Sequence, residues 1–255
     1  MCLIVLAHRA STRFPFVLAA NRDEDYERLS RSAHFWEDAA DVLGGRDERQ
    51  GGSWLAITRR GRVAAITNVR GRENADAPSR GSIVAAFVRS STSPEAFAAT
   101  IAVHGDEYAG FHLIAGQIGG TFVHVSNAGH RAGAWPDGVY GISNAAPGAT
   151  WPKVVRATRH VAAVIGEQNE PALLGYALLD FLGTPGEAAR DRGATLRDEL
   201  EGEVFVMSDR YGTRSSTVII ASGSEILFYE RNYGRGGAPL GQIVEFAFPM
   251  EPEPR

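Results

Sequence analysis

Short apolar runs separated by turn-forming residues recur along the chain and predict β-strands. The first two runs, Cys2–Ala7 and Phe16–Ala20, flank a polar loop and predict an antiparallel hairpin. Trp54–Thr58 and Val63–Asn68 flank Arg60-Gly61, which predicts a second hairpin. Further strands are expected over Phe111–Ile118, Thr121–Ser126, Val139–Ser143, Phe205–Met207, Thr217–Ala221, Ile226–Tyr229 and Val244–Phe248.

Four segments instead carry apolar residues at helical spacing or a helix start signal. One helix is expected to open at Pro78-Ser79, and a second at Ser93-Pro94, with Ser93 as N-cap. Trp151-Pro152 starts the longest helical region, and another helix is expected over Pro171–Leu182. The predicted apolar face of the longest helix consists of Val154, Val155, Thr158, Val161, Ala162 and Ile165.

The order of these elements is strands, helices, strands, helices, strands, which favours an α+β fold with mostly antiparallel sheets. The charged stretch from Asn21 to Gln50 is expected to be irregular. No repeat or inter-domain linker interrupts the pattern, so we expect a single domain over residues 1–255. The last residues, 251–255, are expected to form a disordered polar tail.

Composition narrows the classes of function. The 255 residues carry 26 basic and 30 acidic side chains, and this balance argues against a dedicated nucleic-acid binder. Lys153 is the only lysine, which we interpret as compositional bias. One cysteine excludes a disulfide framework, and the seven histidines lack metal-ligand spacing, so no metal site is predicted. No segment resembles a signal peptide or a transmembrane helix, which favours a cytoplasmic location.

The single cysteine is Cys2, and its position suggests chemistry. Removal of Met1, which a small second residue favours, would leave Cys2 with a free α-amine. An N-terminal nucleophile can use its own α-amine as general base, so one residue supplies both groups. The alternative is that Cys2 is a small buried hydrophobic residue at the start of a strand.

Asn21-Arg22-Asp23-Glu24 follows the second predicted strand. If that strand returns to Cys2, Asp23 lies close to the α-amine, and Asn21 or Arg22 lies near a substrate. The alternative is that Asn and Asp end the strand and the charges belong to a solvated loop.

Two later strands end in an asparagine, Asn68 and Asn144. An amide at a strand end is a reasonable oxyanion donor, although asparagine is also a common turn former. Arg214 precedes an apolar strand, where it is expected to be partly buried and to need an anionic partner, either Asp23 or a substrate carboxylate.

Several sequence blocks together resemble a known family. They include Met1-Cys2-Leu3-Ile4, Asn21-Arg22-Asp23-Glu24, Gly51-Gly52-Ser53-Trp54-Leu55, Gly141-Ile142-Ser143-Asn144, Trp151-Pro152-Lys153 and Gly212-Thr213-Arg214-Ser215-Ser216. In this order they resemble the NRDE family, also called the transport and Golgi organisation protein 2 family. The resemblance extends from Cys2 to about residue 230, nearly the whole chain.

The resemblance implies a four-layer αββα sandwich of two mainly antiparallel sheets, the N-terminal-nucleophile (Ntn) hydrolase-like fold. The family is similar in turn to penicillin V acylase and bile salt hydrolase, which cleave amide bonds. By this resemblance Cys2 matches the nucleophile and Asp23 the aspartate beside its amine. Asn144 matches the oxyanion asparagine, Arg214 a late arginine, and Asn68 an earlier site residue.

The chain departs from those acylases at Ala20, where they usually carry arginine, and Arg22 is a candidate substitute. The expected function is an amidohydrolase or acyltransferase that acts on a small acylated substrate through a thioester. Catalytic roles are expected for Cys2, Asp23, Asn144 and Arg214, and substrate-binding roles for Asn21, Arg22 and Asn68. The alternative is a non-catalytic protein that binds and traffics haem or a lipid or acyl-CoA ligand; no other cofactor is implied.

Overall fold

The computed structural model describes residues 2–74, 76–129, 131–186 and 201–252. Contacts divide the chain into two compact units. The first unit comprises Met1–Arg28, Asp137–Ser143 and Thr150–Ala247, and the second comprises Leu29–Pro136, Asn144–Ala149 and Phe248–Arg255. Among the elements whose bounds lie within the described residues, each unit has one antiparallel sheet and two α-helices. The single-domain organisation expected from the sequence stays a prediction.

The first unit is built on a six-stranded sheet in the order β10-β1-β2-β11-β12-β13. The predicted N-terminal hairpin is confirmed, because β1 and β2 pair antiparallel with Leu3 opposite Asn21. The closing strands are also present and are longer than predicted. The bounds are β1 Leu3–His8, β2 Phe16–Asp25, β10 Gly138–Ile142, β11 Tyr211–Ser222, β12 Glu225–Tyr233 and β13 Pro239–Pro249.

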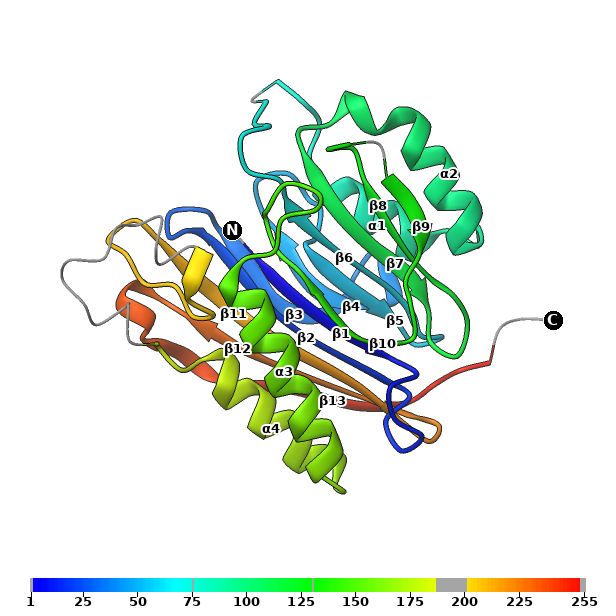
Figure 1. Ribbon diagram of the computed structural model, residues 1–255, viewed down its shortest axis with the longest axis vertical. Helices are drawn as coiled ribbons and strands as arrows, with labels where there is room; N and C mark the ends of the chain where they lie inside the picture. Colours follow the sequence, from blue (N-terminus) through cyan, green and yellow to red (C-terminus); the bar gives the residue numbers. More distant parts are fainter. Residues whose placement is uncertain (1, 75, 130, 187–200, 253–255) are drawn as a thin grey trace. The chain divides into compact units, whose positions relative to one another are not determined.

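Two helices, α3 (Pro152–Glu167) and α4 (Pro171–Leu182), lie side by side along one face of this sheet (Figure 1). Alternate residues of β1 and β2, such as Val5 and Val17, share an apolar core with Val161 of α3 and Leu178 of α4. Both helices start where the sequence pattern predicts, and α4 has the predicted bounds. The predicted apolar face of α3 is wrong at Val155, which is 40% exposed, and at Ala162, which is also exposed.

The second unit contains a seven-stranded sheet in chain order, β3 to β9, with α1 and α2 packed against it. Ser93 caps α2 as predicted, because its hydroxyl accepts a hydrogen bond from the Ala96 N–H. The bounds are β3 Ser30–Trp36, β4 Ala39–Asp47, β5 Leu55–Thr58, β6 Arg62–Asn68, α1 Gly81–Arg89, α2 Pro94–His104, β7 Phe111–Gln117, β8 Phe122–Ser126 and β9 Arg131–Ala134.

The irregular segment expected over Asn21–Gln50 is wrong. Strand β2 continues to Asp25, and β3 and β4 occupy most of the rest. Polar residues extend β2 because each backbone position pairs with β11, up to Asp25 opposite Tyr211. Phe205–Met207 forms only an isolated bridge, Met207 to Gly212. Part of the predicted polar tail, 253–255, lies outside the described residues.

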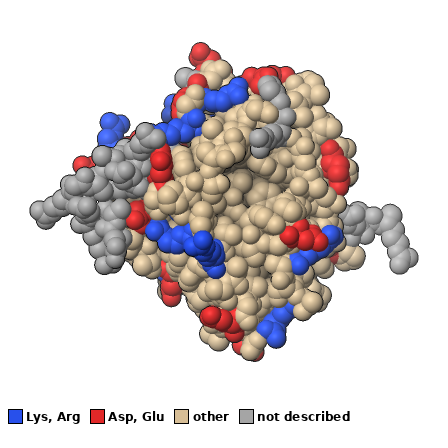
Figure 2. Space-filling model, viewed as in Figure 1, with Lys and Arg blue, Asp and Glu red and all other residues tan. Residues whose placement is uncertain are grey.

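Charged side chains of both signs are intermixed on the face shown in Figure 2. Lys153 is wholly buried, so the basic atoms seen there belong to arginine. Within the part of the chain that the structure covers, no helix is both long and apolar enough to cross a membrane.

Candidate functional site in the first unit

Cys2 directly precedes β1 and is partly exposed. Its backbone carbonyl accepts a 2.6 Å hydrogen bond from the Ser143 hydroxyl, which follows β10. The β1–β2 register pairs Leu3 with Asn21, so one further step places Cys2 opposite Arg22. Because β1 pairs with β2 on one side and with β10 on the other, Cys2 is held next to the polar end of β2.

The surroundings of Cys2 determine how readily its thiol ionises. Burial raises the pKa of the Cys2 thiol, and the negative charge of Asp23 raises it further. Three effects lower the pKa without cancelling the rise: the positive charge of the N-terminal amine, a hydrogen bond with the Asp23 backbone and the positive charge of Arg22. Because the thiolate is the nucleophile, a thiol with a raised pKa needs a nearby base to react at neutral pH.

Asp23 lies on the opposite face of β2 from Arg22, since side chains alternate along a strand. Its carboxylate is buried, and Oδ1 accepts a 2.7 Å hydrogen bond from the hydroxyl of Thr213, its register partner on β11. The Tyr211 hydroxyl donates to the Asp23 backbone carbonyl at 2.6 Å. These contacts hold both the side chain and the backbone of Asp23 in place.

The second oxygen of Asp23 faces a residue that sequence reasoning did not assign to the site. Lys153 Nζ lies 3.6 Å from Asp23 Oδ2, and neither side chain is exposed. Lys153 belongs to the first turn of α3, where the helix dipole disfavours a cation, and the Asp23 carboxylate compensates this cost. One sequence feature could have identified Lys153: the only lysine of the chain directly follows Trp151-Pro152, within a block that carries the family resemblance.

Arg22 is buried and forms an ion pair with Glu24 at 3.5 Å. Because residues two apart share a face of a strand, Arg22 occupies the same face as Ala20, the position where the acylases carry arginine. Its charge also acts on the Cys2 thiol. The geometry is therefore compatible with the predicted substitution of that arginine by Arg22.

Asn21 is fully engaged in structural hydrogen bonds. Its Nδ2 donates to the carbonyls of Leu182 at 2.9 Å and Val204 at 2.8 Å. Its Oδ1 accepts a 2.7 Å hydrogen bond from the Ser216 hydroxyl. These bonds tie β2 to the end of α4, so the structure gives Asn21 a scaffolding position, and its predicted substrate-binding role stays a prediction.

Arg214 is partly buried, as expected, at a bulge between Thr213 and Ser215 in β11. Its hydrogen bonds run to backbone carbonyls, among them Asp25 and Tyr26 at 3.0 Å each. None of the hydrogen bonds found for Arg214 in the described ranges reaches the Asp23 carboxylate. In this structure Arg214 therefore stabilises the loop that follows β2 through hydrogen bonds to its backbone carbonyls.

The two predicted oxyanion residues belong to the second unit, and the structure brings them together. Asn144 is buried, and its Nδ2 donates a 2.7 Å hydrogen bond to the carbonyl of Asn68, at the exposed end of β6. The Arg70 N–H donates to the Asn144 carbonyl, and a ring nitrogen of His112 lies 2.9 Å from the next carbonyl, that of Ala145. The Asn144 segment is therefore held firmly within its own unit.

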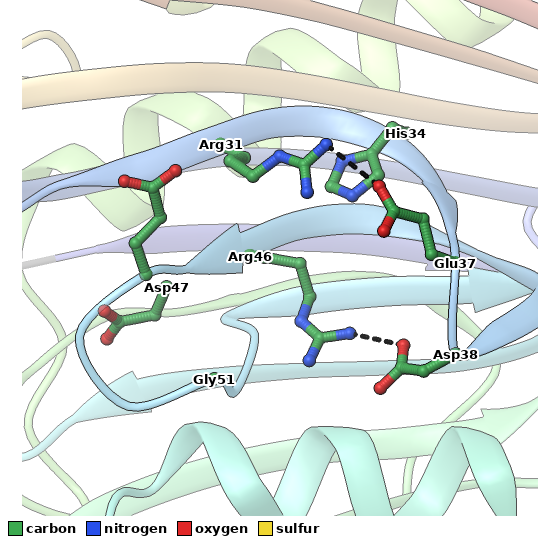
Figure 3. Close-up of a pocket in the computed structure, with 8 residues that line it drawn as sticks. Arg31, His34, Glu37, Asp38, Arg46, Asp47 and Gly51 are labelled. Atoms are coloured by element: carbon green, nitrogen blue, oxygen red, sulfur yellow. Dashed lines mark hydrogen bonds and ion pairs between the residues drawn. The ribbon is translucent and has the colours of Figure 1, made fainter.

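A separate cavity of about 280 Å³ lies on the second unit, over β3 and β4 (Figure 3). Its basic groups already have acidic neighbours: Arg46 pairs with Asp38 at 2.9 Å, and Arg31 with Glu37 at 3.5 Å. It contains none of the residues predicted for the site. Across the described chain, no three His, Cys, Asp or Glu side chains gather as a group that could hold a metal ion.

Comparisons with solved structures address the fold. Penicillin V acylase from Agrobacterium tumefaciens superposes with a TM-score of 0.53 at 11% identity, covering 98% of this chain and 86% of that one. A variant of the conjugated bile acid hydrolase from Clostridium perfringens gives 0.55 at 11% identity, covering 98% and 92%. The predicted Ntn-hydrolase-like fold is confirmed.

Sequence comparisons address the family. Residues 1–235 match the family described as Transport and Golgi organisation 2. The transport and Golgi organization protein 2 homolog of Bos taurus is 33% identical over 239 residues, which span 86% of this chain and 87% of the relative. The chain therefore belongs to the transport and Golgi organisation 2 family.

Proposed function

We propose that this protein is an N-terminal cysteine amidohydrolase or acyltransferase that acts on a small acylated molecule. The observation that carries the proposal is the position of Cys2. Its thiol lies at the start of β1, beside the backbone of Asp23 and within the field of Arg22, on an Ntn-hydrolase-like fold.

The reaction begins after Met1 has been removed. The Cys2 sulfur attacks the substrate carbonyl carbon while the α-amine of the same residue accepts the thiol proton. Collapse of the tetrahedral intermediate breaks the carbon–nitrogen bond, and the α-ammonium returns the proton to the leaving amine. Water or an acceptor nucleophile then attacks the thioester, which releases the acyl group and regenerates the Cys2 thiol.

The residues around Cys2 support these steps. Ser143 binds the Cys2 carbonyl, which fixes the backbone that carries both the nucleophile and the base. Asp23, itself held by Thr213, is the carboxylate assigned to orient the α-amine. Stabilisation of the oxyanion is assigned to Asn144, following the family resemblance.

Intact mass spectrometry with a thioester acyl probe tests the proposal. We expect loss of Met1 and addition of one acyl group. Because the chain has one cysteine, a hydroxylamine-labile adduct must lie on Cys2. The C2S and C2A variants should lose the adduct, and N144A should slow its formation.

Two results would contradict the proposal: retention of Met1, or an adduct whose rate equals that of free cysteine. Either result would favour the alternative function, a non-catalytic protein that binds haem or a lipid or acyl-CoA ligand. It predicts that C2A still binds haemin or an acyl-CoA with unchanged affinity.

A further inference from the structure

The only lysine of the chain is one of its most deeply buried charges. Lys153 is 0% exposed, and its ammonium lies 3.6 Å from Asp23 Oδ2 and 5.5 Å from the centre of the Trp151 ring. Within the described residues, Lys153 Nζ has no hydrogen-bond partner. The Asp23 carboxylate therefore supplies the negative charge that stabilises the Lys153 ammonium.

This arrangement is costly if it serves only to hold α3 on the sheet. Removing an ammonium from water carries a large desolvation penalty, and an apolar side chain of similar size would fill the same space without it. The first turn of α3 adds unfavourable interaction with the helix dipole. The positive charge at this point is therefore better explained by an electrostatic effect on a neighbouring group.

The group affected is indicated by the interactions that Asp23 makes with Cys2. The Asp23 backbone forms a hydrogen bond with the Cys2 thiol, and the Asp23 charge acts on that thiol. In the processed chain, the α-amine of Cys2 and the ammonium of Lys153 would both lie in the field of one carboxylate. A fixed cation close to an amine favours the uncharged amine, which is the form able to accept a proton.

We propose that Lys153 is a positioning residue whose charge, acting through Asp23, keeps the α-amine of Cys2 uncharged at neutral pH so that it can serve as the base. This inference rests on the proposed function. It adds a residue from α3 to the surroundings of Cys2, whose other residues lie on or next to β1, β2, β10 and β11.

Among the described residues, the other charged or titratable groups in the contacts given for Cys2 and Asp23 lie on the strands or directly beside them. Arg22 on β2 acts on the Cys2 thiol, and the Tyr211 hydroxyl of β11 donates to the Asp23 backbone. Burial raises the pKa of Tyr26, directly after β2, and the charge of Asp23 raises it further. Arg22 has the same sign as Lys153 but is paired with Glu24. Lys153, by contrast, is paired directly with the Asp23 carboxylate.

The pKa of the α-amine can be measured directly. After the thiol has been blocked with iodoacetamide, the rate of α-amine acetylation by an N-hydroxysuccinimide ester is followed by mass spectrometry between about pH 6 and pH 9. Wild type is compared with K153M, and K153R serves as the control that keeps the charge. K153Q is a second neutral variant that can still donate a hydrogen bond to Asp23, and circular dichroism verifies that each variant is folded.

We expect the α-amine pKa to rise by about one unit in both neutral variants and to stay near the wild-type value in K153R. Acylation of Cys2 at pH 7 should then slow about tenfold in K153M and recover at higher pH. An α-amine pKa that is equal in all four proteins would overturn the inference, even if Cys2 is acylated and the proposed function stands. The expected pKa change in a protein whose Cys2 is never acylated would support the inference and refute the proposed function. Retention of Met1 would overturn both.

Discussion

Lys153 and Asp23 form an ion pair in which neither side chain is exposed, with 3.6 Å between Nζ and Oδ2. The pair connects α3 to β2 at the strand end that lies beside Cys2. A buried pair is a poor source of net stability, but the loss of one partner leaves an uncompensated charge in the protein interior.

The single variants D23N and K153M should therefore each lower the free energy of unfolding by about 3–5 kcal/mol. The double variant D23N/K153M removes both charges, so its loss should be clearly smaller than the sum of the two. Urea denaturation of the four proteins measures this coupling. Strictly additive losses would show that the two charges do not interact.

The ionisation of Cys2 gives a second test. Burial raises the pKa of the Cys2 thiol, so its alkylation by iodoacetamide at pH 7 should be slower than that of an unfolded cysteine. The charge of Asp23 adds to this rise, so D23N should lower the pKa and increase the alkylation rate at pH 7, by up to about tenfold. The conservative variant D23E keeps the charge and should react slowly. Equal rates in D23N and wild type would contradict the assigned influence of Asp23.

Asp38 on the second unit provides a pH-dependent stability test. Hydrogen bonds from Arg89 and Arg46 lower the pKa of Asp38 to about 2. A carboxyl group with a depressed pKa in the folded state contributes stability above its unfolded pKa and loses it as the pH falls through the folded value. D38N should therefore melt below wild type at pH 7, and the difference should shrink as the pH falls from about 4 through about 2. A difference that is independent of pH would contradict this account.

Gly175 in α4 tests the close approach of that helix to the sheet. A Cβ added at Gly175 would lie 2.5 Å from Cε2 of Tyr229 on β12. We expect G175A to destabilise the protein by about 1–3 kcal/mol, although alanine is the better helix former. The matched control is G166A in α3, where an added Cβ meets nothing within 4 Å. It should raise stability by up to about 1 kcal/mol in thermal melts.

Local pattern was sufficient for much of the fold. The β1–β2 hairpin and the α2 start at Ser93 depend on residues close together in the chain, and both were predicted. Strands β3 and β4 were missed because polar residues fill the first half of β3 and a Gly-Gly pair followed by Arg-Asp ends β4. Such strands are stabilised by pairing, as where Leu43 of β4 lies opposite Ile57 of β5, and short-range propensity does not encode that partner.

The candidate site divides in the same way. The sequence by itself determined that the chain has one thiol, that it sits at residue 2, and that Asp23 follows a strand able to return to it. Only the tertiary structure decided that Asp23 faces Lys153 and Thr213, that Asn21 is used by the scaffold, and that Arg214 binds backbone carbonyls. Partners for a buried charge come from segments distant in the chain, and strand register and helix packing select them.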